Sequence, residues 1–397
     1  MKKVLMIALE FPPCRSAGVQ RTLRFTEYLP DFQWQPLVVT ATDNIYEQLD
    51  LSVSLPEHLD GHIVKAKCKD AAKHYGYKGK YFYWMTLPDR YWPWYFDAVK
   101  QASKLIEQHK PDIIWSTYPV LTTHLIAKKL HNKYNIPWVA DYRDPLQCHY
   151  DKSHQPYAGI KKRLEKKVVA QASKVVFTAE RAADFYRELY PEIAESKFVS
   201  IENGFQQSVN RHHTLAIKPK KFTLLYSGML YANGRDPEPL FKALALLKQD
   251  LVINKDTFTL NFRATKGDYS LLLKQLDIVD LVNFLPAFSF AEALAEMQTA
   301  SANLLIQDGV FQRQIPGKIY EYISVRKPVL ALTPNNSATY DVVQGFGYGF
   351  SAYGVTDIAN KIKYLLENNI DCNEDISQYS RKNKTAALAD LFDSLVP

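Results

Sequence analysis

Strand and helix signals alternate along the whole chain, and this alternation restricts the fold more than any other feature of the sequence. Short apolar runs rich in β-branched and aromatic residues are separated by stretches with helical periodicity. Strands that alternate with helices form parallel sheets, because each crossover helix returns the chain to the same end of the sheet. The sequence therefore predicts an α/β fold.

The order of these signals predicts two similar halves. At 397 residues the chain exceeds the size of one ordinary hydrophobic core. The expected strands begin at residues 4, 37, 63, 112, 138, 174 and 198 in the first half, and at 222, 257, 282, 302, 328 and 347 in the second. We expect an N-terminal domain over residues 1–205, a linker over 206–221, a C-terminal domain over 222–375 and a C-terminal helix over 376–397 that packs on the N-terminal domain.

Composition excludes several classes of protein. The chain is 47% hydrophobic and 23% charged, which is typical of a folded globular protein. No apolar run is long enough to span a membrane, and the apolar start that ends at Glu10 reads as a first strand, not a signal peptide. The four cysteines show no metal-ligand spacing and no dense framework, so we expect reduced thiols and a cytoplasmic location. No His, Cys and Asp residues have zinc-ligand spacing and no Gly-x-Gly-x-x-Gly motif is present, so we expect neither a metal nor a bound cofactor.

The segment from Gln314 to Leu332 carries the most chemical information. It predicts a helix between two buried strands, with a proline near each end of the helix. Lys318 and Glu321 are three residues apart and share one helix face. At the carboxyl end of a parallel sheet, the lysine suits a diphosphate and the glutamate suits the hydroxyls of a ribose. The alternative is a solvated ion pair of small energetic value, about 0.2–0.5 kcal/mol.

The string Pro316-Gly-Lys-x-x-Glu321, followed by Lys327-Pro328-Val, resembles the nucleotide-binding motif of family-4 type retaining glycosyltransferases. The resemblance implies the GT-B fold, with two Rossmann-like domains facing across a cleft and the donor nucleotide on the C-terminal one. It also implies that Lys318 contacts the diphosphate and Glu321 the ribose. Many relatives have a first glutamate near the donor sugar, and Arg313 stands at that position in this chain.

The same resemblance suggests further donor contacts in the second half. Gly228 follows the first expected strand of that half, and Asn233 and Arg235 lie a few residues later. The family often places a cation directly after this glycine, where the present chain has Met229. We therefore assign phosphate neutralisation to Arg235, together with Lys318.

Two motifs in the first half supply the other candidate residues. Gly18 lies in the loop after the first strand, where a similar loop of the family faces donor phosphate and acceptor. Asp141, Arg143 and Asp144 end a strand in an Asp-x-Arg-Asp-Pro string that resembles a bacterial surface-polysaccharide subset of the family. This implies catalytic roles in orienting the acceptor hydroxyl and handling its proton. The alternatives are an ordinary turn at Gly18 and a salt-bridged turn at the charged group.

The predicted function is metal-independent transfer of a monosaccharide from a nucleotide-diphosphate sugar to a glycan or polyprenyl-linked glycan acceptor, with retention, in bacterial surface polysaccharide synthesis. One alternative is a non-catalytic subunit that binds nucleotide sugars, which the residues Met229 and Arg313 favour. Another is a different GT-B enzyme, such as a sugar-nucleotide epimerase or a phosphorylase.

Basic residues cluster, although the formal net charge is only +7. Lys73, Lys78 and Lys80 alternate with aromatic residues up to Trp84, and a second cluster lies at 161–167. A solvated face is one interpretation. The other is attachment to the anionic inner face of the plasma membrane, where basic and aromatic side chains meet lipid headgroups. No nucleic-acid motif accompanies these clusters, so we do not expect a nucleic-acid partner.

Overall fold

The computed structural model describes residues 1–78, 80–146, 157–206, 220–230, 233–265 and 267–396. It divides the chain into two compact units. Unit 1 comprises Met1–Asn203 and Arg381–Pro397, and unit 2 comprises Gly204–Ser380. Most of the expected linker, residues 207–219, lies outside the described residues.

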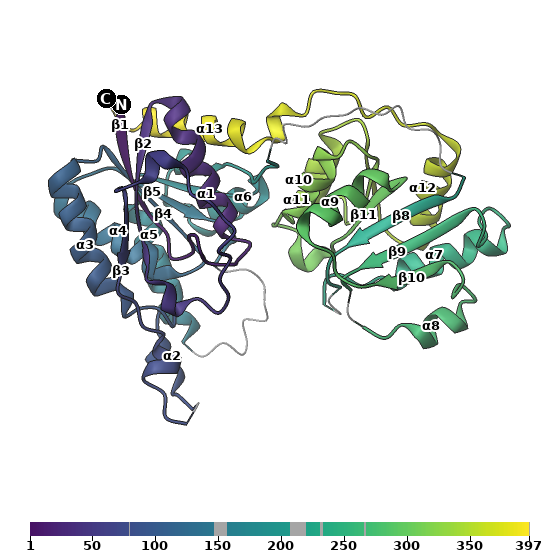
Figure 1. Ribbon diagram of the computed structural model, residues 1–397, viewed down its shortest axis with the longest axis horizontal. Helices are drawn as coiled ribbons and strands as arrows, with labels where there is room; N and C mark the ends of the chain where they lie inside the picture. Colours follow the sequence, from purple (N-terminus) through teal and green to yellow (C-terminus); the bar gives the residue numbers. More distant parts are fainter. Residues whose placement is uncertain (79, 147–156, 207–219, 231–232, 266, 397) are drawn as a thin grey trace. The chain divides into compact units, whose positions relative to one another are not determined.

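Within its described residues, unit 1 contains a seven-stranded parallel sheet in the order β3-β2-β1-β4-β5-β6-β7 (Figure 1). The strands are β1 (Lys2–Ile7), β2 (Trp34–Ala41), β3 (Ile63–Ala66), β4 (Ile113–Thr117), β5 (Trp138–Tyr142), β6 (Lys174–Phe177) and β7 (Phe198–Ser200). The helices are α1 (Val19–Tyr28), α2 (Ala71–His74), α3 (Trp94–His109), α4 (Leu121–Tyr134), α5 (Ala158–Gln171), α6 (Glu180–Leu189) and α13 (Arg381–Asp393). The central strands are almost wholly buried, because helices cover both faces of such a sheet.

Unit 2 has a similar plan, with a six-stranded parallel sheet among its described residues in the order β10-β9-β8-β11-β12-β13. Its strands are β8 (Phe222–Ser227), β9 (Phe258–Arg263), β10 (Val282–Leu285), β11 (Ala302–Ile306), β12 (Val329–Leu332) and β13 (Gly349–Ala352). Its helices are α7 (Glu238–Gln249), α8 (Ser270–Gln275), α9 (Phe290–Thr299), α10 (Lys318–Ser324), α11 (Ala338–Gln344) and α12 (Val355–Glu367). The prediction of an α/β protein with two parallel sheets is confirmed.

Strand order places a switch point in each sheet. In unit 1, β1 pairs with β2 on one side and β4 on the other. In unit 2, β8 pairs with β9 and β11 in the same way. The loops after such neighbouring strands diverge to opposite faces of the sheet and leave a crevice at the carboxyl edge, where open α/β sheets bind ligands. The loops after β1, β4, β8 and β11 are therefore the places to look for a site.

The C-terminal helix differs in extent from the predicted helix over 376–397. Residues up to Ser380 belong to unit 2, and α13 begins at Arg381 in unit 1. The ring of Phe392 packs on Trp34 at a centroid distance of 5.2 Å, and Lys384 forms an ion pair with Glu202 at 3.1 Å. These contacts attach α13 to the N-terminal sheet, so the last residues of the chain complete the core of unit 1.

Candidate functional site

Lys318 and Gly228 meet at the carboxyl edge of the sheet of unit 2. A Cβ atom added to Gly228 would lie 2.5 Å from the ammonium nitrogen of Lys318. Gly228 follows β8 with φ of +148°, and its N–H donates to Arg263 O at 2.9 Å while its carbonyl accepts from Thr265 Oγ1 at 2.7 Å. The turn is thus held on both sides, and the missing side chain provides the room that the lysine occupies.

The charge on Lys318 is poorly compensated. Burial lowers the pKa of Lys318 from 10.5 to about 8; the neighbouring Glu321 raises it, and Arg235 lowers it further. Two cations therefore lie near one carboxylate in a site that disfavours positive charge. An anion bound there would raise the pKa of Lys318 back toward its usual value.

Arg235 is positioned by the loop after β8. Its Nη1 donates to Met229 O at 3.4 Å, and its guanidinium lies 5.9 Å from the ring centre of Phe311. Gly234 has φ of +90°, and its Cα lies so close to Phe311 that an added Cβ would be 2.4 Å from the ring. Asp308 N donates to Gly234 O at 2.9 Å, which ties the loops after β8 and β11 together. Asn233, in the same loop, is exposed.

Arg313 lies between β11 and α10, partly exposed, in a loop organised by a buried amide. Gln307, directly after β11, donates from Nε2 to Gln314 O at 2.7 Å and to Phe311 O at 3.3 Å. Sequence reasoning missed Gln307, although a polar residue that directly follows a buried strand is a usable signal. The helix expected between the two buried strands is α10, which begins at Lys318, two residues after Pro316.

In unit 1, Gly18 packs against an ion pair. Arg143 donates from Nη2 to Glu10 Oε2 at 2.8 Å and from Nε to the carbonyl of Tyr118. A Cβ on Gly18 would collide with both Arg143 and Glu10. Glu10 follows β1 and Tyr118 follows β4, and these two strands are neighbours at the switch point of the sheet. By bonding to both residues, Arg143 links the two loops across the switch point. Glu10 was not among the predicted site residues, since its partner is distant in sequence.

Asp141 lies deeper than the sequence suggested. Its carboxylate accepts from Arg21 Nη2 at 2.7 Å, Arg21 Nε at 3.0 Å and Thr117 Oγ1 at 2.8 Å. Both charged side chains are almost completely buried, and Arg21 continues to the carbonyl of Ile201 at 2.9 Å. This geometry favours a positioning role for Asp141, because its oxygens are occupied and shielded from solvent. Asp144 lies two residues after the end of β5; the residue reaches solvent, yet burial of its carboxyl group raises its pKa.

His124 is a buried neighbour of this region and is neutral. Burial, and then the charge of Arg143, lower its pKa from 6.5 to about 3. Its Nδ1 lies 2.8 Å from Ser116 Oγ, and its ring stacks on Tyr142 at 4.6 Å. Because a neutral, stacked imidazole fits a packing role, His124 adds no acid or base at neutral pH.

The structure thus gathers the predicted residues into two groups, each within one unit. Lys318, Glu321, Arg235 and Gly228 lie together in unit 2, and Gly18 and Arg143 lie together in unit 1, above the buried Asp141. Among the described residues, no group of three or more His, Cys, Asp or Glu side chains is arranged to hold a metal ion. No helix in the described part of the chain is long and apolar enough to cross a membrane.

Comparison with known proteins shows a likeness to one protein family. The sequence pattern of glycosyltransferase family 4 matches residues 21–208. The chain is therefore similar to glycosyltransferase family 4 over slightly less than half of its length. No curated protein sequence matches it at a significant level.

Solved structures show that the chain has the GT-B fold. Sucrose-phosphate synthase from Thermosynechococcus elongatus has a TM-score of 0.60 and 13% identity, over 100% of this chain and 95% of that chain. Anabaena HepE in complex with UDP and glucose has a TM-score of 0.62 and 13% identity, over 100% of both chains. The lipopolysaccharide outer core galactosyltransferase WaaB has a TM-score of 0.63 and 13% identity, over 99% of this chain and 100% of that chain. At this level of identity the likeness establishes the fold.

Proposed function

We propose that the enzyme transfers a monosaccharide from a nucleotide-diphosphate sugar to a glycan or polyprenyl-linked glycan acceptor, with retention of configuration, in bacterial surface polysaccharide synthesis at the cytoplasmic face of the membrane. One observation carries the proposal: a partly buried lysine of lowered pKa is held against a glycine backbone at the switch point of unit 2. HepE, a structure of the same fold, holds UDP and glucose, and WaaB is a lipopolysaccharide galactosyltransferase.

The chemistry proposed for unit 2 is electrostatic. When the bond between sugar and diphosphate breaks, negative charge grows on the departing phosphates and an oxocarbenium-like sugar forms. Lys318 and Arg235 oppose the phosphate charge in a site of low polarity, where such interactions are strong. Glu321 limits the repulsion between the two cations and is assigned to the ribose hydroxyls.

In unit 1 we assign acceptor contacts to the region around Gly18, Arg143 and Asp144. Arg143 is held by two hydrogen bonds, so its guanidinium has a defined direction before an acceptor arrives. Asp141 and Arg21 lie beneath this region and join β5 to the end of β7, so they keep the loops in place. Asp141 thus acts as a positioning residue in this mechanism.

The test is ligand-dependent stability. Wild-type protein is heated with a panel of nucleoside diphosphates and their sugars, and a ligand at a hundred times its dissociation constant stabilises by about 2.7 kcal/mol. Lys318→Ala should abolish the shift in melting temperature, whereas Lys255→Ala, an exposed lysine elsewhere in unit 2, should retain it. A panel without any stabilising ligand, or equal shifts in both variants, would refute the donor site.

A non-catalytic nucleotide-sugar subunit is the second candidate. It is favoured by Met229, which is 43% exposed where relatives carry a cation, and by Arg313 at the glutamate position. Donor binding without donor hydrolysis or transfer would support it. If the missing cation alone limits turnover, Met229→Arg should raise the rate of donor hydrolysis.

A further inference from the structure

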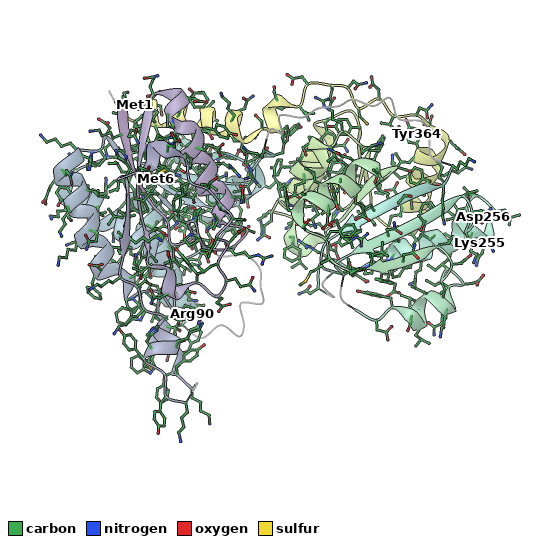
Figure 2. The ribbon with its side chains drawn as sticks, in the orientation of Figure 1. Met1, Met6, Arg90, Lys255, Asp256 and Tyr364 are labelled. Atoms are coloured by element: carbon green, nitrogen blue, oxygen red, sulfur yellow. The ribbon has the colours of Figure 1, made fainter. Side chains whose placement is uncertain are left out.

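A projection leaves the body of unit 1 after β3. The chain departs at Ala66, forms α2 and a 3₁₀ turn at Tyr83–Thr86, and returns to α3 at Trp94 (Figure 1). An ion pair between Asp70 and Arg90 closes its base, and Ala71 N donates to Arg90 O at 2.7 Å. Figure 2 shows Arg90 where the projection joins the rest of unit 1. The segment is therefore anchored at both ends.

The projection carries large aromatic side chains in solvent. Tyr77 is 77% exposed, Phe82 is 70% exposed and Trp84 is 58% exposed. Phe82 and Trp84 stack on each other with centroids 6.3 Å apart, so they remain together on the surface. Water-exposed aromatic groups in such a cluster mark a surface that is covered in function.

The start of α5 joins the projection to form one surface. Tyr83 stacks on Tyr157 with centroids 5.9 Å apart and an angle of 5° between the rings. Lys161 Nζ donates to Tyr83 OH at 3.0 Å. We call the combined area the aromatic–basic surface; it consists of Tyr77, Lys78, Lys80, Tyr81, Phe82, Tyr83, Trp84, Tyr157, Ile160, Lys161, Lys162 and Arg163.

The charge of the aromatic–basic surface has one sign. No Asp or Glu occurs between Ala71 and Pro88 in the sequence, or between Tyr157 and Leu164. Glu165, the next residue, is fully buried and accepts a hydrogen bond from Tyr186. Exposed cations interleaved with aromatic rings complement lipid phosphates, since rings settle at headgroup level and each nearby Lys or Arg strengthens attachment about fivefold.

The aromatic–basic surface lies at the carboxyl edge of the sheet of unit 1. Its two segments follow β3 and β5, and the Glu10–Arg143 pair follows β1 and β5. Carboxyl ends of parallel strands meet at one edge, so the surface and the proposed acceptor region share that edge. We propose that the aromatic–basic surface docks unit 1 on an anionic lipid bilayer, with Phe82 and Trp84 at headgroup level and the lysines on lipid phosphates. If a second copy of the chain covered this surface, it would need to present acidic side chains to the lysines, whereas an anionic bilayer supplies negative charge on its phosphates.

Sedimentation with vesicles tests this without any sugar donor, so its result is independent of the proposed transfer reaction. The full chain should bind vesicles of phosphatidylcholine with phosphatidylglycerol, and should bind pure phosphatidylcholine vesicles at least about tenfold less. Lys78→Gln/Lys80→Gln should weaken binding by about tenfold or more. The matched control Lys255→Gln/Lys363→Gln removes the same charge from exposed sites in unit 2 and should leave binding unchanged.

The contribution of the aromatic side chains to vesicle binding is tested with a separate variant and its control. Phe82→Ala/Trp84→Ala should weaken binding about tenfold, whereas Phe290→Ala, a 69% exposed ring in unit 2, should not. Brominated acyl chains should quench tryptophan fluorescence in the wild type, and less in Trp84→Phe. Equal binding to both kinds of vesicle, no binding by a folded wild type, or an unchanged Phe82→Ala/Trp84→Ala variant would overturn the proposal. So would a dimer that this variant dissociates, because the surface would then be a contact between copies.

Discussion

The ammonium of Lys318 occupies the space that a side chain on Gly228 would fill. The contact joins the loop after β8 to the first residue of α10, and the two residues are 90 positions apart in the sequence. It depends on a glycine at a backbone angle that other residues rarely adopt. The proposed donor site therefore rests on backbone geometry as much as on charge.

Gly228→Ala should weaken nucleotide-diphosphate binding strongly. The added methyl group would lie 2.5 Å from the lysine nitrogen, so Lys318 must move away from its position. We expect a loss of affinity of about tenfold or more, measured by calorimetry with the best diphosphate ligand. Gly354→Ala is the control, because Gly354 also has a positive φ, of +86°, but nothing within 4 Å of an added Cβ. Equal losses in both variants would assign the effect to backbone strain.

Donor affinity should depend on pH through Lys318. In the free protein its pKa is about 8, and a bound anion raises that pKa. At neutral pH the lysine is already charged and affinity is constant; above about pH 8 binding must take up a proton, so affinity falls by up to tenfold per pH unit. Lys318→Arg keeps its charge over this range and should show a flat profile. The same slope in Lys318→Arg would contradict the assignment.

The buried pair of Arg21 and Asp141 should matter for stability. Asp141→Asn leaves the Arg21 guanidinium buried without a counter-charge, so we expect unit 1 to lose about 3 kcal/mol of unfolding free energy. Asp43→Asn makes the same change in an exposed pair with Lys65 and should cost less than about 1 kcal/mol. Urea unfolding measures both. If Asp141→Asn retained full stability and lost activity, Asp141 would be a catalytic residue in the direct sense.

Arg143→Lys should impair acceptor use while sparing donor binding. A lysine keeps the charge but loses the fork that bonds Glu10 and the carbonyl of Tyr118 together. We expect kcat/KM for the acceptor to fall about tenfold, with an unchanged melting shift by the donor. Arg24→Lys on α1, in an ion pair with Glu27, is the matched control and should be nearly neutral. If the donor no longer raised the melting temperature of Arg143→Lys, the assignment of Arg143 to acceptor binding would be wrong.

Most strands were predictable because a buried parallel strand consists of a short continuous run of apolar residues, which is visible in the local sequence. Apolar runs such as Ala302–Ile306 carry their own signal, and all six strands of unit 2 lie within a few residues of the predicted positions. Short helices carry a weaker local signal: α11 has seven residues and begins at a single side-chain cap, Ser337, whose hydroxyl accepts from Tyr340 N at 3.1 Å.

The amino-acid sequence by itself determined the α/β class, the two-domain plan and the placement of Lys318 and Glu321 on one short helix, because these follow from local periodicity and spacing. Tertiary structure alone decided the partners: Arg21 for Asp141 across 120 positions, Glu10 for Arg143, Gly228 for Lys318 and Tyr157 for Tyr83. Strand order and register bring such residues together, and no local pattern encodes them.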